Sequence, residues 1–239
     1  MDTLSLVDRL SELSTDLTAA ERENLKFLLS MAAGGFLSGR AQDLPDPLRE
    51  LALTTAQRTL PRLHGGGRPA FDTGVVFCGA GPFFSAHDLA ALDQESLTHR
   101  QRAERFHDHF VFSGAPLARE LALSQSVNQF LTERVGPVLP TYKANYLYYD
   151  QPGLGIDPHV DKDEFSLNVL TMLQHDADGP RQSELILYPP EQDAIHLHLE
   201  PGQSLVFFAD SVTHQRTRTV AGEVIRLVSF GYRPIGGSS

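Results

Sequence analysis

The segment DPHVDKDEF, residues 157–165, places Asp157, His159 and Asp161 within five residues. Side chains two residues apart on an extended strand point to the same side, so His159 and Asp161 would direct an imidazole and a carboxylate at one point. Both groups bind first-row transition metals. A His-x-Asp pair is also common in solvent-exposed turns, so these residues alone do not define a metal site.

His214 supplies a third candidate ligand, 53 residues after Asp161. It follows the apolar run SLVFF and the short turn ADS, a separation that allows the chain of a two-sheet barrel to cross over and return beside its start. Two histidines and one carboxylate form a facial triad that leaves metal positions open, as suits non-haem Fe(II).

Arg226 lies twelve residues after His214, inside the apolar segment GEVIRLVSFGY. A guanidinium in an apolar strand is costly to bury without an acceptor, and its planar fork matches a carboxylate. That carboxylate is either one of the chain's own acids or part of a ligand, and the sequence leaves both interpretations open.

Taken in order, His159-x-Asp161, His214 and Arg226 resemble the Fe(II)- and 2-oxoglutarate-dependent dioxygenases of the prolyl-hydroxylase-like and small-molecule hydroxylase branch. The segments YYDQPGLGIDPHVD, SELILYPP and LEPGQSLVFFADSVTHQ are similar to strands and turns of that family. The resemblance covers roughly residues 140–235.

The resemblance implies a role for each matching residue. His159, Asp161 and His214 would bind Fe(II), and Arg226 would pair with the distal carboxylate of 2-oxoglutarate. Many relatives have Arg-x-Ser at this point, whereas here Ser229 follows three residues after the arginine and should face the opposite side of the sheet. A second contact to the carboxylate would then come from another strand, with three candidates: Tyr146, Tyr148 and Asn168.

The implied activity is an oxidoreductase that consumes dioxygen, decarboxylates 2-oxoglutarate to succinate and hydroxylates an unactivated C–H bond. The substrate would be a small molecule, an amino acid or a peptide. The carboxylate of Asp161 favours hydroxylation over halogenation, because halogenating relatives have a small residue there. Two alternatives remain: a cupin-like module that binds metal or ligand without redox chemistry, and a facial-triad oxidase that does not use 2-oxoglutarate.

The predicted fold is α+β, a single domain over residues 1–239. Residues 1–139 are expected to form a mainly helical layer, with a capping box from Thr18 to Glu21, helices over 96–110 and 116–136, and one strand in GVVFCGAG. After Pro140, short alternating segments separated by turns predict an antiparallel sandwich or barrel. The family resemblance specifies this as a double-stranded β-helix (jelly-roll, cupin-like) core over 140–235.

Composition excludes some partners. The formal charge of −10, from 30 acidic and 20 basic residues, argues against nucleic acid and anionic membranes. The sequence has no apolar run near the ~18 residues of a membrane span and no signal-like N-terminus, so we expect a cytoplasmic protein. Its one cysteine, Cys78, is expected to be a small buried residue. The oligomeric state is not predicted.

Several other polar residues are weaker candidates. His107 and His109 in a helix would not share a face, although they could lie near the pocket. His196 and His198 are expected on the solvent face of a strand. Arg216 and Arg218 follow His214 and would either contact a ligand or lie on a surface hairpin. The segment GAGPFF, 79–84, lacks a phosphate-loop pattern and is a candidate lid.

Overall fold

The structure is a computed structural model, and it describes residues 73–189 and 192–235, together with a few positions before them: Arg9, Glu12, 16–18, Glu21, Leu25, Thr55 and Thr59. The predicted capping box is confirmed, since the Glu21 carboxylate accepts from the Thr18 N–H at 2.8 Å and the Glu21 N–H donates to the Thr18 hydroxyl. The mainly helical layer expected here otherwise lies outside the described residues, except that Arg9, Glu12, Asp16, Glu21, Leu25, Thr55 and Thr59 are helical.

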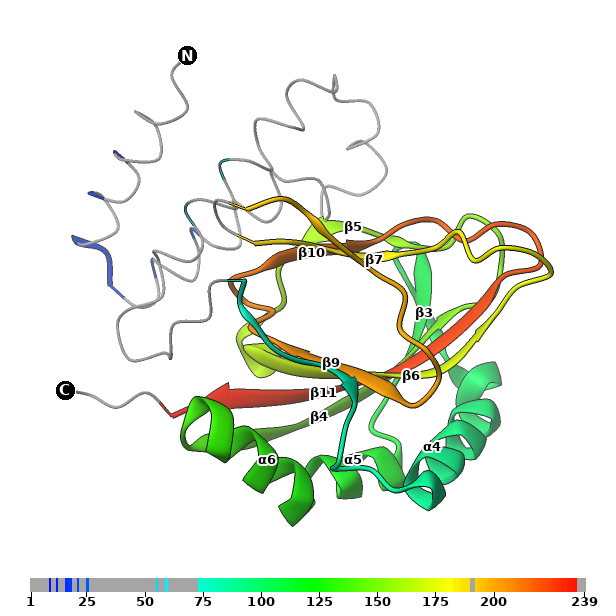
Figure 1. The fold of residues 1–239 in the computed structure, drawn as a ribbon, viewed down its shortest axis with the longest axis horizontal. Helices are drawn as coiled ribbons and strands as arrows, with labels where there is room; N and C mark the ends of the chain where they lie inside the picture. Colours follow the sequence, from blue (N-terminus) through cyan, green and yellow to red (C-terminus); the bar gives the residue numbers. More distant parts are fainter. Residues whose placement is uncertain are drawn as a thin grey trace.

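The core consists of two antiparallel sheets that face each other (Figure 1). The larger has the order β1-β9-β6-β11-β4-β3-β2 and the smaller β5-β10-β7-β8. The strands of the larger sheet are β1 Val75–Ala80, β2 Glu104–Phe106, β3 His109–Ser113, β4 Val138–Tyr149, β6 Leu167–Asp176, β9 Gln203–Phe207 and β11 Val224–Pro234. Those of the smaller are β5 Ile156–His159, β7 Leu185–Tyr188, β8 Ile195–Leu197 and β10 Thr213–Arg216. This is the predicted jelly-roll arrangement.

Three helices cover the outer face of the larger sheet (Figure 1): α4 Ala86–His99, α5 Pro116–Ala122 and α6 Gln125–Val135. A capping box between Ser85 and Asp88 begins α4, and Pro116 occupies the first turn of α5, where its missing N–H costs nothing. The short 3-10 helices η3 Arg100–Arg102 and η4 Asp163–Phe165 complete the elements.

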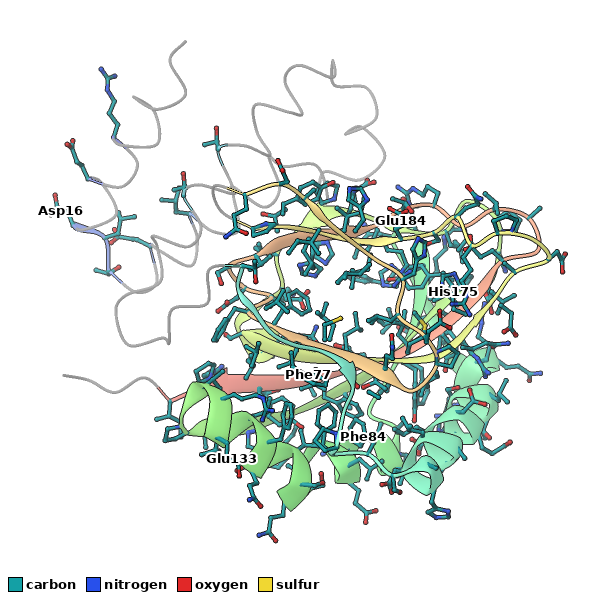
Figure 2. All side chains as sticks on the ribbon, viewed as in Figure 1. Asp16, Phe77, Phe84, Glu133, His175 and Glu184 are labelled. Carbon is teal, nitrogen blue, oxygen red and sulfur yellow. The ribbon has the colours of Figure 1, made fainter. Side chains whose placement is uncertain are left out.

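The larger sheet separates two apolar clusters. Val228 and Phe230 of β11 pack with the helices, and Phe84 contacts Phe230 at 5.3 Å between ring centroids. Phe77 and Phe84 lie at this sheet–helix interface in Figure 2. Ile225 and Leu227 belong to the second cluster, between the two sheets. Alternation along β11 therefore assigns each side chain either to the helix side or to the interior of the barrel.

Gly231 allows the segment after Asp161 to lie against β11. A Cβ at this position would stand 2.2 Å from the Glu164 carbonyl oxygen of η4 and 2.6 Å from the Thr141 hydroxyl. That hydroxyl lies 2.8 Å from the Glu164 carbonyl oxygen and 2.9 Å from that of Gly231. The three segments are thus tied together directly beside the candidate metal ligands.

The N-terminal half differs from the prediction. The expected helix over 96–110 is wrong, since α4 ends at His99 and is followed by η3 and then by a hairpin of β2 and β3. The arginines of η3 lie over aromatic rings of β3, Arg100 over Phe110 and Arg102 over Phe112. The expected helix over 116–136 is two helices, α5 and α6, that meet at Leu123 and Ser124. Residues 73–139 therefore supply three strands of the core as well as helices.

Two smaller expectations are corrected. Cys78 is exposed, because β1 is an edge strand of the larger sheet. The segment 79–84 is not a lid, since Phe83 and Phe84 are buried in the cluster beneath the helices. Among the helices that the structure describes, none is long and apolar enough to span a membrane.

Candidate metal centre

Neighbouring strands of the smaller sheet bring His159, Asp161 and His214 together. His159 ends β5 and lies directly opposite His214 on β10, with ring centroids 4.3 Å apart. The Asp161 Oδ1 atom is 3.5 Å from the His159 Nε2 atom and 3.7 Å from the His214 Nε2 atom. One ligand atom from each residue lies within 4.8 Å of the other two. Among the described residues this is the one cluster of three His, Cys, Asp or Glu side chains that could hold a metal ion.

Backbone carbonyls orient both histidines. The His159 Nδ1 atom lies 2.9 Å from the Asp157 carbonyl oxygen, and the His214 Nδ1 atom lies 3.0 Å from that of Val212. A carbonyl only accepts, so each imidazole has its hydrogen on Nδ1 and its lone pair on Nε2. Both Nε2 lone pairs are thus directed toward the Asp161 carboxylate, as a metal site requires.

Asp161 lies beyond the end of β5, so strand alternation is not what brings it beside His159. Its N–H donates to the Ala209 carbonyl at 2.7 Å, which ties this loop to the turn before β10. The Asn168 amide donates to Asp161 Oδ2 at 2.9 Å, and the Ser229 hydroxyl donates to the Asn168 carbonyl oxygen at 2.9 Å. A chain from Ser229 through Asn168 therefore positions the carboxylate and leaves Oδ1 toward the histidines.

Burial and mutual charge set the protonation states of this group. Burial, with a smaller contribution from the proximity of His159, lowers the pKa of His214 to about 4. Burial also raises the pKa of Asp161, but the proximity of the His159 and His214 imidazoles and the hydrogen bond from Asn168 outweigh it, so the pKa of that carboxyl is lowered overall. Neutral His214 and ionised Asp161 are the forms that bind a divalent metal.

The three ligands lie in the wall of a cavity of about 760 Å³ between the two sheets. This volume is within the usual range for small-molecule sites. Its lining is apolar around Leu170, Leu185 and Leu227, whereas η3, β2 and the segment after Asp161 line it with charged side chains: Arg102, Glu104, Arg105, Lys162 and Glu164.

The ligand set fits a divalent transition metal. Ligands about 2.1 Å from a metal at right angles to one another lie about 3 Å apart, so the observed 3.5 and 3.7 Å need only a small contraction. Two imidazoles and one carboxylate on one side of the ion suit iron, and the adjoining cavity gives its remaining positions access to ligands.

Arg226 does not lie in this cavity, which corrects the role expected for it. It projects from the helix side of β11, where its Nη2 atom pairs with Asp93 Oδ1 of α4 at 2.8 Å and its Nη1 atom donates to the Ser96 hydroxyl at 3.2 Å. Ser229 does face the opposite side, as alternation predicted, and it lines the cavity instead. The acceptor for Arg226 is therefore one of the chain's own acids.

Tyr146 and Tyr148 are also on the helix side, so neither contacts the cavity. The Tyr146 hydroxyl donates to the Glu95 carboxylate at 2.7 Å, and the Tyr148 hydroxyl donates to the Ser96 carbonyl at 2.8 Å. Asn168 alone of the three candidates lines the cavity, where it holds Asp161.

Two further residues line the cavity: Arg216, for which the sequence left contact with a ligand and a surface hairpin equally open, and Tyr149, which the sequence gave no role. Arg216 lies two residues after His214 on β10 and is only 4% exposed, and Tyr149 of β4 lies under it, with the guanidinium carbon 5.5 Å from the ring centroid. Burial raises the pKa of Tyr149 to about 12, so its hydroxyl remains a hydrogen-bond donor. The signal available in the sequence was the His-x-Arg spacing, which places both side chains on one face of a strand.

The weaker candidates lie outside the metal centre. His109 is buried on β3 and its ring stacks on Tyr149 at 5.2 Å, so it does lie near the pocket, whereas His107 occupies the turn with a φ of 53°. His196 and His198 are on the solvent side of the smaller sheet, as expected, and both contact Glu184, which is labelled in Figure 2. Arg218 pairs with Asp108 and Asp157.

Comparison with known proteins identifies the class of fold. No family model and no curated protein matches the chain. Solved structures do match at low identity, among them the epimerase SnoN from nogalamycin biosynthesis in complex with Fe3+, alpha ketoglutarate and nogalamycin RO, at 15% identity over 68% of this chain and 82% of that one, with a TM-score of 0.56.

Two further neighbours have similar scores. A 2OG-Fe(II) oxygenase family oxidoreductase from Burkholderia pseudomallei matches at 19% identity over 64% of this chain and 81% of its own, with a TM-score of 0.53. HygX from Streptomyces hygroscopicus, solved with nickel and 2-oxoglutarate, matches at 13% over 69% and 84%, with a TM-score of 0.52. The chain thus has the double-stranded β-helix fold of the Fe(II)/2-oxoglutarate oxygenases, and the resemblance expected from its sequence is confirmed for the fold.

Proposed function

We propose that this protein is an Fe(II)- and 2-oxoglutarate-dependent oxygenase, in which His159, Asp161 and His214 bind the iron. The observation that carries the proposal is the convergence of these three ligand atoms within 4.8 Å in the wall of a cavity between the sheets. The shared fold with oxygenases supports it, because the same two sheets surround the site.

When iron, 2-oxoglutarate and dioxygen are bound, they supply the oxidising chemistry of this enzyme class. The residues of the chain would bind the metal and hold its protein ligands in a fixed orientation. His159 and His214 contribute Nε2 lone pairs fixed by carbonyls at Nδ1, and Asp161 contributes a carboxylate fixed by Asn168. The apolar walls at Leu170, Leu185 and Leu227 exclude water from the space next to the ligands.

The expected reaction is hydroxylation of an unactivated C–H bond. Asp161 would supply the third protein ligand to the metal, and its carboxylate would fill the position that a halide takes in halogenating relatives. Solved structures with this fold include an epimerase, a carbocyclase and a prolyl hydroxylase in complex with a peptide fragment, so the fold hosts several reaction outcomes. The cavity volume favours a small molecule, an amino acid or a short peptide segment as substrate.

The test is an anaerobic titration of the purified protein, first with Fe(II) and then with 2-oxoglutarate. We expect a saturable visible charge-transfer band from the chelate, followed on admission of air by slow formation of succinate. His159→Ala and Asp161→Ala should abolish both signals, because each removes a ligand. Glu184→Ala is the matched control, since this acid contacts two histidines on the solvent side of the smaller sheet and leaves the ligand triad intact.

Other results would reassign the site. Iron binding without a chelate band would move the assignment to an oxidase that does not use 2-oxoglutarate. Failure to bind any divalent metal in the wild-type protein would refute the metal site itself, and a stable chelate with no dioxygen consumption under any condition would favour a binding module.

A further inference from the structure

Arg216 is a buried cation without an acceptor inside the cavity. It is 4% exposed, it lines the cavity, and no hydrogen bond or ion pair of its guanidinium is found among the residues that the structure describes. Its contacts are the ring of Tyr149, with the guanidinium carbon 5.5 Å from the ring centroid, and a longer-range attraction to Glu223. A guanidinium carries five donors, and burying it without acceptors is costly, so the site is built for an anionic ligand.

The nearest buried acid does not satisfy this arginine. Glu223 Oε1 lies 2.9 Å from His175 Nε2 and accepts the N–H groups of Gln182 and Ser183, each at 3.0 Å, and its Oε2 accepts that of Val220 at 3.2 Å. Four hydrogen bonds therefore engage this carboxylate, and none of them comes from Arg216. The cavity is also lined by Glu104, Asp161 and Glu164, and in the part of the chain that the structure describes none of these acids pairs with Arg216.

The position of Arg216 relative to the metal ligands matches the length of a five-carbon dicarboxylate. His214 and Arg216 pair with Leu187 and Leu185 of β7, so they are two residues apart on one face of β10. That advance is about 7 Å along a strand. The two carboxyl carbons of an extended 2-oxoglutarate are about 5 Å apart, from bonds of about 1.5 Å, so one end can reach the metal while the other meets the arginine.

We infer that Arg216, with the Tyr149 hydroxyl as a second donor, binds the distal carboxylate of 2-oxoglutarate, and that Arg226 has no part in it. The inference rests on the proposed function. It moves the carboxylate site from the strand that the sequence pattern indicated, β11, to the strand of the distal histidine, β10. In this complex the Arg216 guanidinium and the distal carboxylate would pair with each other, in the planar two-point contact that arginine favours with carboxylates.

The experiment titrates two ligands anaerobically into the Fe(II)-loaded wild-type protein and into variants of the two arginines. Binding is measured by the chelate absorption band and by calorimetry. The ligands are 2-oxoglutarate and 2-oxobutyrate, which has the same chelating end and no distal carboxylate. In Arg216→Met we expect the dissociation constant of 2-oxoglutarate to rise about 30- to 100-fold, because charge-assisted contacts are lost. The affinity for 2-oxobutyrate should be unchanged, and Tyr149→Phe should cost about 3- to 10-fold.

Arg226→Met is the matched control, an equally conservative change of a buried arginine outside the cavity, and should leave both affinities at the wild-type values. Urea unfolding of Arg216→Met should show a stability equal to or above that of the wild type, because an uncompensated cation has been removed. Equal loss of affinity for both ligands in Arg216→Met, or a selective loss in Arg226→Met, would overturn the inference. A wild-type protein that binds iron but neither 2-oxo acid would instead refute the proposed function.

Discussion

Replacing Arg226 with methionine should destabilise the protein and leave its cavity unchanged. The guanidinium makes one charged hydrogen bond of 2.8 Å to Asp93 and one of 3.2 Å to the Ser96 hydroxyl. Hydrogen bonds to charged groups contribute about 1.5–3 kcal/mol each. Two features reduce this value here: the Asp93 side chain is 37% exposed, and Arg226 Nε is buried without a partner.

We therefore expect a loss of about 1–2 kcal/mol in the free energy of unfolding, since methionine retains the apolar stem that packs between α4 and β11. The assay is urea denaturation, in which the midpoint should fall while the slope stays the same. A double-mutant cycle with Asp93→Asn isolates the pair and should give a coupling energy of about 1 kcal/mol.

Arg119→Met is the control, because Arg119 is an exposed arginine of α5 and its replacement should change stability by less than about 0.5 kcal/mol. The reasoning is refuted if Arg226→Met keeps the wild-type midpoint and instead loses 2-oxoglutarate binding. That outcome would mean that the arginine leaves its contact with α4 in solution and enters the cavity.

Three further predictions concern the surroundings of the metal centre. Asn168→Leu removes the donor to Asp161 Oδ2, so the dissociation constant for Fe(II) should rise about 10- to 100-fold, and an unchanged constant would contradict the positioning role. Burial lowers the pKa of His109 to about 3, below its ordinary value near 6.5, so the unfolded chain binds a proton first on acidification. The contribution of neutral His109 to the free energy of unfolding should thus be fully present above about pH 6.5 and fall as the pH decreases toward 3, by at most about 5 kcal/mol. In His109→Phe the free energy of unfolding should depend less on pH over this range. Gly231→Ala places a Cβ 2.2 Å from the Glu164 carbonyl and should cost about 1–3 kcal/mol, whereas Gly179→Ala, with open space around it, should be neutral in the same thermal or urea unfolding assay.

The strands and metal ligands were predictable because their signals are local. Alternating apolar segments separated by glycine, proline and aspartate turns mark β4, β6, β7, β9 and β11 at nearly their observed positions. The histidines of the centre could be selected because His159 and His214 follow turns that return the chain to one place in a two-sheet barrel. The hairpin of β2 and β3 was missed because its residues also suit a helix, and only packing against β4 decides between the two.

The sequence by itself determined the fold class, the three candidate ligands and the opposite orientation of Arg226 and Ser229. Tertiary structure decided which of the two faces the cavity. Alternation fixes only relative orientation, and the register of β11 against β6 shifts between Arg226 and Leu227. The helix side supplies an acid, Asp93, that pairs with Arg226, whereas no acid of the described residues pairs with Arg216. Whether a buried arginine has an acceptor thus depends on the elements that the fold brings around it, and no single segment of the sequence determines that.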